Sequence, residues 1–269
     1  MSRVTARRKT TRLSPTGRIE RPDTLAVEEP LEIRVDGRSL TVTMRTPGND
    51  IDLVHGFLFG EDIIGSADDI VSARYCAGTD SAGHNTYNVL DLRLRHQVPI
   101  HTRNFLTTGG CGLCGKTALD DVRTHSRFPI PHESVSISTD TLAELPKQLR
   151  AGQKLFESTG GLHAAGLFTT DGTLLALRED IGRHNAVDKV IGWAVRENRV
   201  PAHDSVLVVS SRASFELAQK AVMAGIPILA AVSAPSALAV DLAAESDLTL
   251  VGFLRAETMN IYTGEHRLT

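Results

Sequence analysis

The feature that most constrains the fold is an alternation of apolar and helix-like segments in the last quarter of the chain. The apolar segments are expected strands at 206–210, 227–233 and 248–253, and the segments between them are expected helices at 215–224 and 236–244. Strands that are apolar along their whole length are typical of parallel sheets buried on both faces. Because strand–helix–strand units connect by right-handed crossovers, this region predicts a parallel sheet with helices on both faces.

The first half of the chain predicts a smaller, strand-rich part. Apolar residues alternate with polar ones on both sides of Asp36-Gly37, which indicates a β-hairpin over 31–44. A helix is expected at 51–58, and further strands are expected at 71–75 and 87–94.

Phe128-Pro-Ile-Pro131 predicts a boundary, because prolines at alternate positions forbid a helix. Beyond it we expect a helix at 138–153, a strand at 174–178 and a helix that begins near Asn185.

Three parts are therefore expected. Residues 1–27 are basic and poor in large apolar groups, the composition of a flexible, solvated arm. Residues 28–131 are expected to form an N-terminal β-rich part that carries a cysteine loop, and residues 132–269 an α/β part.

Composition excludes several classes of protein. Aromatic residues make up only 4% of the 269 residues and the net charge is −3, which disfavours a nucleic-acid platform built on base stacking. No apolar run reaches the roughly 18 residues that a membrane helix needs. Arg7-Arg8 has no hydrophobic segment after it, so we expect no twin-arginine export signal and a cytoplasmic protein. Three cysteines cannot form a disulfide framework, and they suggest a reducing compartment.

The strongest chemical signal is a pair of cysteines three residues apart, Cys111 and Cys114, among four glycines and just before Lys116. The thiolate is the nucleophilic form of cysteine, and a nearby ammonium and a following helix N-terminus both favour it. An expected helix at 117–123 supplies that N-terminus. Flanking glycines leave room for a partner to approach either sulfur, so the segment predicts sulfur chemistry on an accessible loop.

Three other interpretations of the pair stay open. A zinc half-site would need Cys76 or histidines such as His84, His101 and His125 to complete it. A thioredoxin-like dithiol would lie between a strand and a helix, whereas the glycines favour a loop. The third interpretation is an inert buried pair, since free cysteine often packs as a small hydrophobe.

Polar residues gather where the expected strands of the α/β part end. Arg178 to Lys189 holds many ionisable side chains at a strand-to-helix junction, including Arg183 and His184. Ser211 and Arg212 follow the next buried strand and open a helix, so hydroxyls, backbone N–H groups and a guanidinium can together bind phosphate. Ligands gather at the carboxyl ends of parallel strands, and we therefore expect a binding site at this edge. No Walker-type loop or dinucleotide fingerprint is present.

Gly161-Leu-His-Ala-Ala165 resembles the His-x-Glu element of zinc nucleoside deaminases, with alanine in place of the glutamate. The matching Pro-Cys-x-x-Cys element is absent, and Ser211-Arg212-Ala-Ser214 takes its place. The pattern suggests deaminase architecture without deaminase chemistry. A zinc protein of deaminase ancestry is a further interpretation.

Separated segments resemble, in order, those of the FdhD proteins, which are accessory sulfur carriers (sulfurtransferases) for formate dehydrogenase. They are Glu29–Arg34, Met44–Gly48, Gly56–Phe59, Cys111–Lys116, Thr159–Ala164, Arg178–Lys189, Arg212–Glu216, Ala224–Leu229 and Val251–Arg255. The resemblance implies a cytidine-deaminase-like mixed sheet with flanking helices, and a homodimer.

The resemblance also implies a function. A cysteine desulfurase would pass sulfur to Cys111 as a persulfide, with Cys114 as its partner in relay or resolution. The sulfur would go to the molybdenum cofactor, Mo-bis(molybdopterin guanine dinucleotide), which formate dehydrogenase needs; the cofactor is a bound substrate, and no metal ion of the protein's own is expected. The family's cofactor segment falls on Phe253, Leu254, Arg255, Ala256, Glu257 and Thr258. The alternative function is a non-catalytic, cofactor-binding chaperone of formate dehydrogenase.

Overall fold

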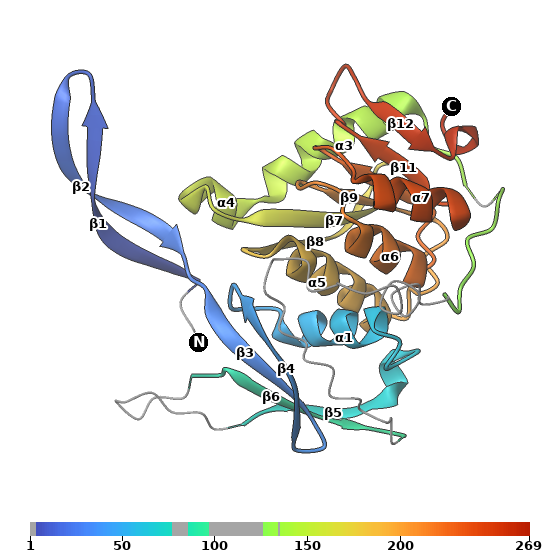
Figure 1. Cartoon of the computed structure of the whole chain (residues 1–269), viewed down its shortest axis with the longest axis horizontal. Coiled ribbons are helices and arrows are strands. Elements are labelled where there is room, and N and C mark those ends of the chain that lie inside the picture. Colours follow the sequence, from blue (N-terminus) through green and yellow to red (C-terminus); the bar gives the residue numbers. More distant parts are fainter. Residues whose placement is uncertain (1–3, 77–85, 97–125, 134) are drawn as a thin grey trace.

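The computed structural model describes residues 4–76, 86–96, 126–133 and 135–269. In these residues a projecting hairpin, a four-stranded sheet and a six-stranded sheet follow one another along the chain (Figure 1). No helix in these ranges combines the length and the apolar character that crossing a membrane requires.

The N-terminal part is a four-stranded sheet of order β4-β3-β6-β5 with one helix against it. Its elements are β3 (Glu29–Val35), β4 (Arg38–Arg45), α1 (Asp50–Gly60), β5 (Ile70–Tyr75) and β6 (Val89–Leu94). The predicted hairpin is confirmed, with Asp36 and Gly37 both at positive φ as a two-residue turn between twisted strands requires. The helix and the two further strands are also where the sequence placed them.

The C-terminal part is a six-stranded sheet of order β12-β11-β10-β9-β7-β8. Its strands are β7 (His163–Thr169), β8 (Leu174–Asp180), β9 (Ser205–Val209), β10 (Ile228–Ala231), β11 (Thr249–Gly252) and β12 (Asn260–Thr263). Its helices are α3 (Thr139–Gly152), α4 (Lys154–Thr159), α5 (Arg183–Arg196), α6 (Phe215–Met223) and α7 (Ala237–Glu245).

The mixed sheet with flanking helices is confirmed, but parallel pairing is confined to β9, β10 and β11. The other strands, β7, β8 and β12, pair antiparallel to their neighbours. Val206 and Val208 of β9 pack with α3, whereas Leu207 and Val209 pack with α5 and α6 on the opposite face. Burial on both faces explains why β9 is apolar along its length.

Several elements escaped the sequence analysis. Three of them are α4, β7 and β12, for which no helix or strand was predicted. The segment expected to be a flexible arm forms an antiparallel hairpin of β1 (Thr5–Ser14) and β2 (Gly17–Ala26). Hydrophobic alternation could not reveal this hairpin, because most of its side chains on both faces are exposed.

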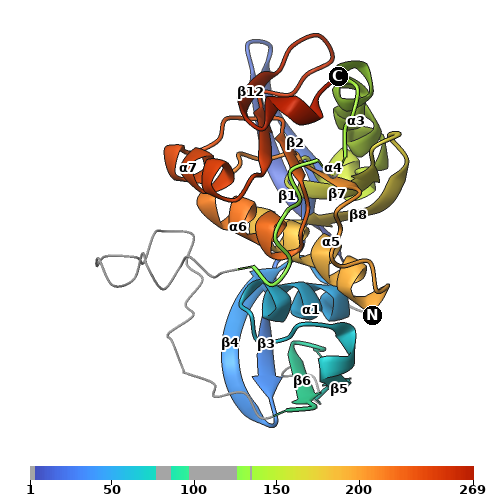
Figure 2. The same cartoon turned by 90° about the vertical axis from the view of Figure 1, so that its right-hand side faces the viewer.

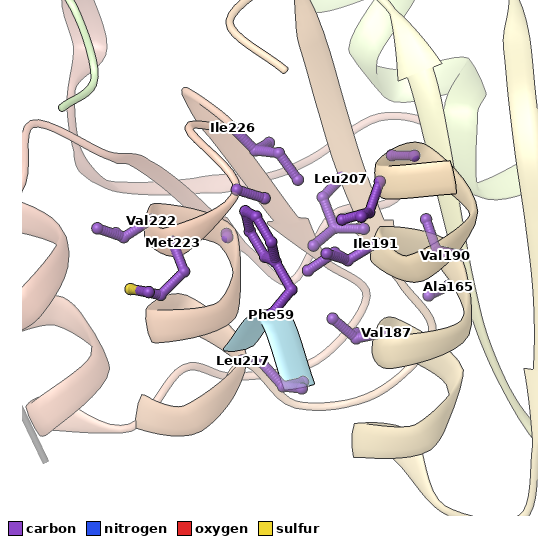
Figure 3. Close-up of a cluster of buried hydrophobic side chains, with 14 of the residues drawn as sticks. Phe59, Ala165, Val187, Val190, Ile191, Leu207, Leu217, Val222, Met223 and Ile226 are labelled. Carbon is purple, nitrogen blue, oxygen red and sulfur yellow. The ribbon is translucent and has the colours of Figure 1, made fainter. Parts of the chain in front are cut away.

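The two sheets share one hydrophobic core. A continuous cluster of buried side chains runs from β3 and β6 through α1 to α5, α6 and β9. Figure 3 shows Phe59 at the end of α1 among Val187 and Ile191 of α5, Leu217 of α6 and Leu207 of β9. The N-terminal part therefore packs through α1 directly onto the helices that cover the larger sheet.

Two glycines set the distance between α1 and α5. A Cβ atom added at Gly56 would lie 1.9 Å from the carbonyl oxygen of Asp188, and one added at Gly192 would lie 1.8 Å from that of Asp52. The obstacles are backbone atoms, which cannot rotate away as a side chain can. Only glycine permits this approach of the two helices.

We predict that Gly192→Ala lowers the free energy of unfolding by at least about 1–3 kcal/mol, because the helices must separate and the core between them must repack. Urea unfolding followed by circular dichroism measures the change. Gly161→Ala is the matched control, since the nearest atom to its added Cβ is 4.0 Å away. Equal stability of the two variants would show that the crossing tolerates a side chain.

Candidate functional site

The carboxyl ends of β8, β9, β10 and β11 lie along one edge of the larger sheet, together with the start of β7. At the same edge α5, α6 and α7 begin, after Gly182, Ser214 and Ser236 respectively. Helix N-termini carry free N–H groups and a partial positive charge. Three of them along one edge favour an anionic ligand.

Backbone hydrogen bonds tie the loops of this edge into one surface. Ala213 donates to the carbonyl oxygen of Ala234 at 3.2 Å, and Ser236 donates back to that of Ala213 at 3.0 Å. Phe253 donates to the carbonyl oxygen of Ser233 at 3.2 Å. The loops after β9, β10 and β11 are thus held in fixed relative positions.

The turn before α5 is built around the buried carboxylate of Asp180. Its Oδ2 lies 2.7 Å from the ammonium of Lys189 and accepts a hydrogen bond from the backbone N–H of Thr46 at 3.2 Å. Its Oδ1 accepts from Gly182 at 2.9 Å. Thr46 comes from the N-terminal part, and its hydroxyl accepts from the backbone N–H of Ile181. The smaller part therefore helps to position the start of α5.

Most of the charged residues between Arg178 and Lys189, which we expected to form a site, are engaged in structural ion pairs. Arg178 pairs with Asp52 at 2.8 Å and Asp188 with Lys220 at 2.6 Å, in addition to the pair at Asp180. These pairs are mainly buried, where a charge without a partner would be costly. Arg183 and His184 lie in the first turn of α5 rather than before it, and their role in a site stays a prediction.

Arg183, His184 and Arg212 form a cationic cluster beside His163, the first residue of β7. Burial lowers the pKa of His163, and the positive charges of Arg183, His184 and Arg212 lower it further. The Nε of Arg183 is buried and has no hydrogen-bond partner among the described residues. The cluster is therefore an electropositive surface with at least one N–H group that could donate a hydrogen bond to a ligand.

His184 is held by the first turn of α6. Its Nε2 contacts the carboxylate of Glu216 and lies 3.5 Å from the hydroxyl of Ser214. The hydrogen bond from His184 lowers the pKa of Glu216 below its usual value. This carboxylate thus orients the imidazole of His184 at the start of α5.

The remaining predicted residues of the edge differ in their accessibility. Ser211 is buried, and its hydroxyl donates to the carbonyl oxygen of Arg212, which is itself exposed. Leu254 belongs to the hydrophobic core with no exposed surface, so only its backbone faces the edge loops. Phe253, at positive φ, and residues 255–258 are exposed, and the backbone N–H of Arg255 donates to the carbonyl oxygen of Thr258 at 2.9 Å.

Cys111 and Cys114 lie outside the described residues, as do His84, His101 and His125 from the zinc interpretation. Cys76 follows β5 and carries a free thiol. The choice between the interpretations of the cysteine pair therefore rests on experiment.

In the described part of the chain, one group of side chains offers three metal-ligand atoms close together: His132, Asp247 and His266, within 4.8 Å of one another. Asp247 already accepts from the guanidinium of Arg267 at 3.0 Å and from His132 at 2.9 Å. The imidazoles of His132 and His266 stack at 4.1 Å. These contacts give the group a structural role in fastening the C-terminal segment to the turn after α7.

His163 and Glu216 lie beside the cationic cluster, and the sequence-based list of site residues did not include them. The deaminase-like motif pointed at His163, and its partner residues on the next strand, Ser211 and Arg212, do follow β9 alongside it. Glu216 gave a weaker signal, as an acidic residue in the first turn of a helix.

Comparisons with known proteins fit this geometry. The sequence model of the FdhD/NarQ family matches residues 26–269. The chain belongs to the FdhD/NarQ family. It is 74% identical over 266 residues to a protein of Nocardia farcinica named sulfur carrier protein FdhD, with 99% of this chain and 95% of that protein covered.

Two further relatives show how far the similarity extends. A protein of Mycolicibacterium paratuberculosis with the same name is 58% identical, with 98% of this chain and 99% of that protein covered. The crystal structure of a putative formate dehydrogenase accessory protein from Desulfotalea psychrophila is similar in fold, with a TM-score of 0.78 at 24% identity, covering 99% of this chain and 100% of that one. The family match thus covers residues 26–269, and the similarity in fold extends over 99% of the chain.

We predict that Arg212→Gln raises the pKa of His163, because it removes one of the positive charges that oppose protonation. NMR titration of the imidazole C–H resonances measures the shift, and Arg199→Gln, which removes a guanidinium that lies over Trp193, is the control. The folded pKa lies below the unfolded value of about 6.5, so His163 makes the protein less stable as the pH falls below that value. If the pKa of His163 were the same in Arg212→Gln, the charge of Arg212 would have no effect on His163, and the prediction would be wrong.

Proposed function

We propose that the protein is a sulfur carrier for formate dehydrogenase: it accepts sulfur from a cysteine desulfurase and delivers it to a phosphorylated molybdenum cofactor bound at the sheet edge. The observation that carries the proposal is the cationic cluster at the starts of α5 and α6, whose chemistry suits a pyrophosphate. The name of the relatives, sulfur carrier protein FdhD, supports the sulfur-transfer half of the proposal.

In the loading step the Cys111 thiolate attacks the outer sulfur of the desulfurase persulfide. A new S–S bond forms at Cys111, the S–S bond of the donor breaks, and the donor cysteine leaves as a thiolate, so no outside oxidant or reductant is needed. Cys114 then attacks the inner sulfur of the Cys111 persulfide. Hydrosulfide leaves for the cofactor, the two cysteines form a disulfide, and a cellular thiol reductant restores them.

The cofactor is the substrate of this transfer, and its guanine dinucleotide carries the pyrophosphate. Arg183, Arg212 and Arg255 would bind the phosphates, and the backbone N–H groups at the starts of the three helices would add donors. Glu216 would hold the imidazole of His184 in position beside the same anion. Residues 253–258 lie on the neighbouring loop and would contact the guanine end. The protein would act in the cytoplasm, as two copies of this chain.

We predict that incubation with a cysteine desulfurase and cysteine adds one sulfur atom to the peptide that holds Cys111. Mass spectrometry of non-reduced digests detects the gain. Cys111→Ala should abolish it, whereas Cys76→Ala, which removes the thiol after β5, should leave it unchanged. Formate dehydrogenase activity in cells that carry only Cys111→Ala should be lost as well.

A second function, a cofactor-binding chaperone without sulfur transfer, draws on the same cationic cluster. It predicts normal cofactor delivery by Cys111→Ala and no sulfur on the digested peptide. The mass measurement therefore decides between the carrier and the chaperone.

We predict that Arg212→Gln weakens binding of GDP, used as a probe for the nucleotide end of the cofactor, by at least about tenfold, since a charge-assisted hydrogen bond contributes about 1.5–3 kcal/mol. Isothermal titration calorimetry measures the dissociation constant. Arg199→Gln should bind GDP as the unmodified protein does. If the unmodified protein and both variants bound GDP equally well, Arg212 would not belong to the anion site.

A further inference from the structure

The β1–β2 hairpin stands away from the rest of the molecule (Figure 1). In the described part of the chain β1 and β2 pair only with each other, and the nearest element of the body is α4, which contacts β2. A two-stranded hairpin alone is at best marginally stable in water and needs a third layer to pack against. A hairpin of two ten-residue strands therefore calls for a partner surface.

The register divides the hairpin side chains between two faces, since directly paired residues share a face and alternate residues along a strand do too. One face carries two large apolar side chains, Ile19 and Leu25, which are 60% and 43% exposed, together with Arg8, Arg12, Arg21 and Asp23. We call this the arginine face. The opposite face carries one large apolar side chain, Leu13, together with Arg7, Arg18 and the pair of Lys9 with Glu20 at 2.6 Å.

The hairpin and the rest of the chain carry opposite charge. Residues 5–26 hold six basic and two acidic residues, so the rest of the chain holds 23 basic and 30 acidic ones. The stretch 221–254 contains no basic residue. Most of this stretch is buried, and its acidic residues, Asp241, Glu245 and Asp247, lie on α7 and in the turn after it. A second copy of this chain therefore offers carboxylates near α7 to the hairpin.

α7, which lies in that stretch, forms an exposed surface of matching character together with the neighbouring β12. Leu238 and Asp241 lie one turn apart on α7 and are exposed, and Tyr262 of β12 is exposed on the same side of the sheet. Exposed apolar side chains around a carboxylate complement the arginine face. We call this surface the α7–β12 surface.

The hairpin lies at the opposite end of the molecule from α7 and β12 (Figure 1), and the view in Figure 2 looks onto the α7–β12 end with the hairpin behind it. A hairpin cannot reach the α7–β12 surface of its own chain. Two copies related by a two-fold axis, side by side and antiparallel, would bring each hairpin to the other copy's surface and close the assembly.

We propose that the β1–β2 hairpin is an arm that docks, through its arginine face, on the α7–β12 surface of a second copy. This inference deepens the two-copy assembly proposed above. The family model matches residues 26–269, so nearly the whole hairpin lies outside the matched residues.

The test compares two double variants with the same change of charge, by sedimentation equilibrium of the full-length protein. Arg12→Glu/Arg21→Glu reverses charges on the arginine face, and Arg7→Glu/Arg18→Glu reverses charges on the opposite face. We expect the first to raise the dissociation constant of the dimer at least about tenfold more than the second, because like charges placed together across an interface are strongly unfavourable.

A charge exchange identifies the partner surface. Asp241→Arg added to Arg12→Glu/Arg21→Glu should restore most of the dimer, and a photo-crosslinking residue at Ile19 should join to a peptide from α7 or β12 of another copy. If neither double variant weakened the dimer, the proposed docking of the hairpin would be wrong, and the two-copy assembly would still stand. A monomer at all concentrations would overturn both, and sulfur loading of Cys111 tests the carrier function independently of either result.

Discussion

The close crossing of α1 and α5 is the contact on which the rest of the structure depends. At Gly56 and Gly192 the backbones touch, so the side chains around the crossing can form one core rather than two. A small strand-rich part would bury too little surface alone to be very stable. Because α1 packs against α5, the buried side chains of the smaller part belong to the same hydrophobic core as those under the larger sheet.

The same crossing connects the smaller part to the ligand-binding edge. Asp52 on α1 accepts from Arg178 on β8. Thr46, just before α1, bonds to Asp180 at the end of β8 and to Lys189 in the middle of α5. The edge loops thus rest on contacts from both parts of the chain.

The edge itself shows how one architecture can serve different chemistry. At the position where the deaminase-like motif would use a metal ligand and a proton-shuttling glutamate, this chain has His163 followed by Ala165. The next strand end supplies Arg212 instead of cysteine. Guanidinium groups and helix starts create an anion-binding surface from the same strand ends, which fits a role in binding rather than hydrolysis.

The sequence by itself determined the elements whose pattern is local. The buried strands β9, β10 and β11, the turn at Asp36-Gly37, the helix α3 and the gathering of Arg183 and Arg212 at strand ends were all predictable, because burial period and turn chemistry act within a few residues. Only the tertiary structure decided which of the charged side chains between Arg178 and Lys189 form buried ion pairs. Arg178 and Lys189 resemble Arg183 in sequence, and their partners, Asp52 and Asp180, come from residues that folding brings together. The hairpin of residues 5–26 likewise needed coordinates, since a ribbon exposed on both faces leaves no hydrophobic period in its sequence.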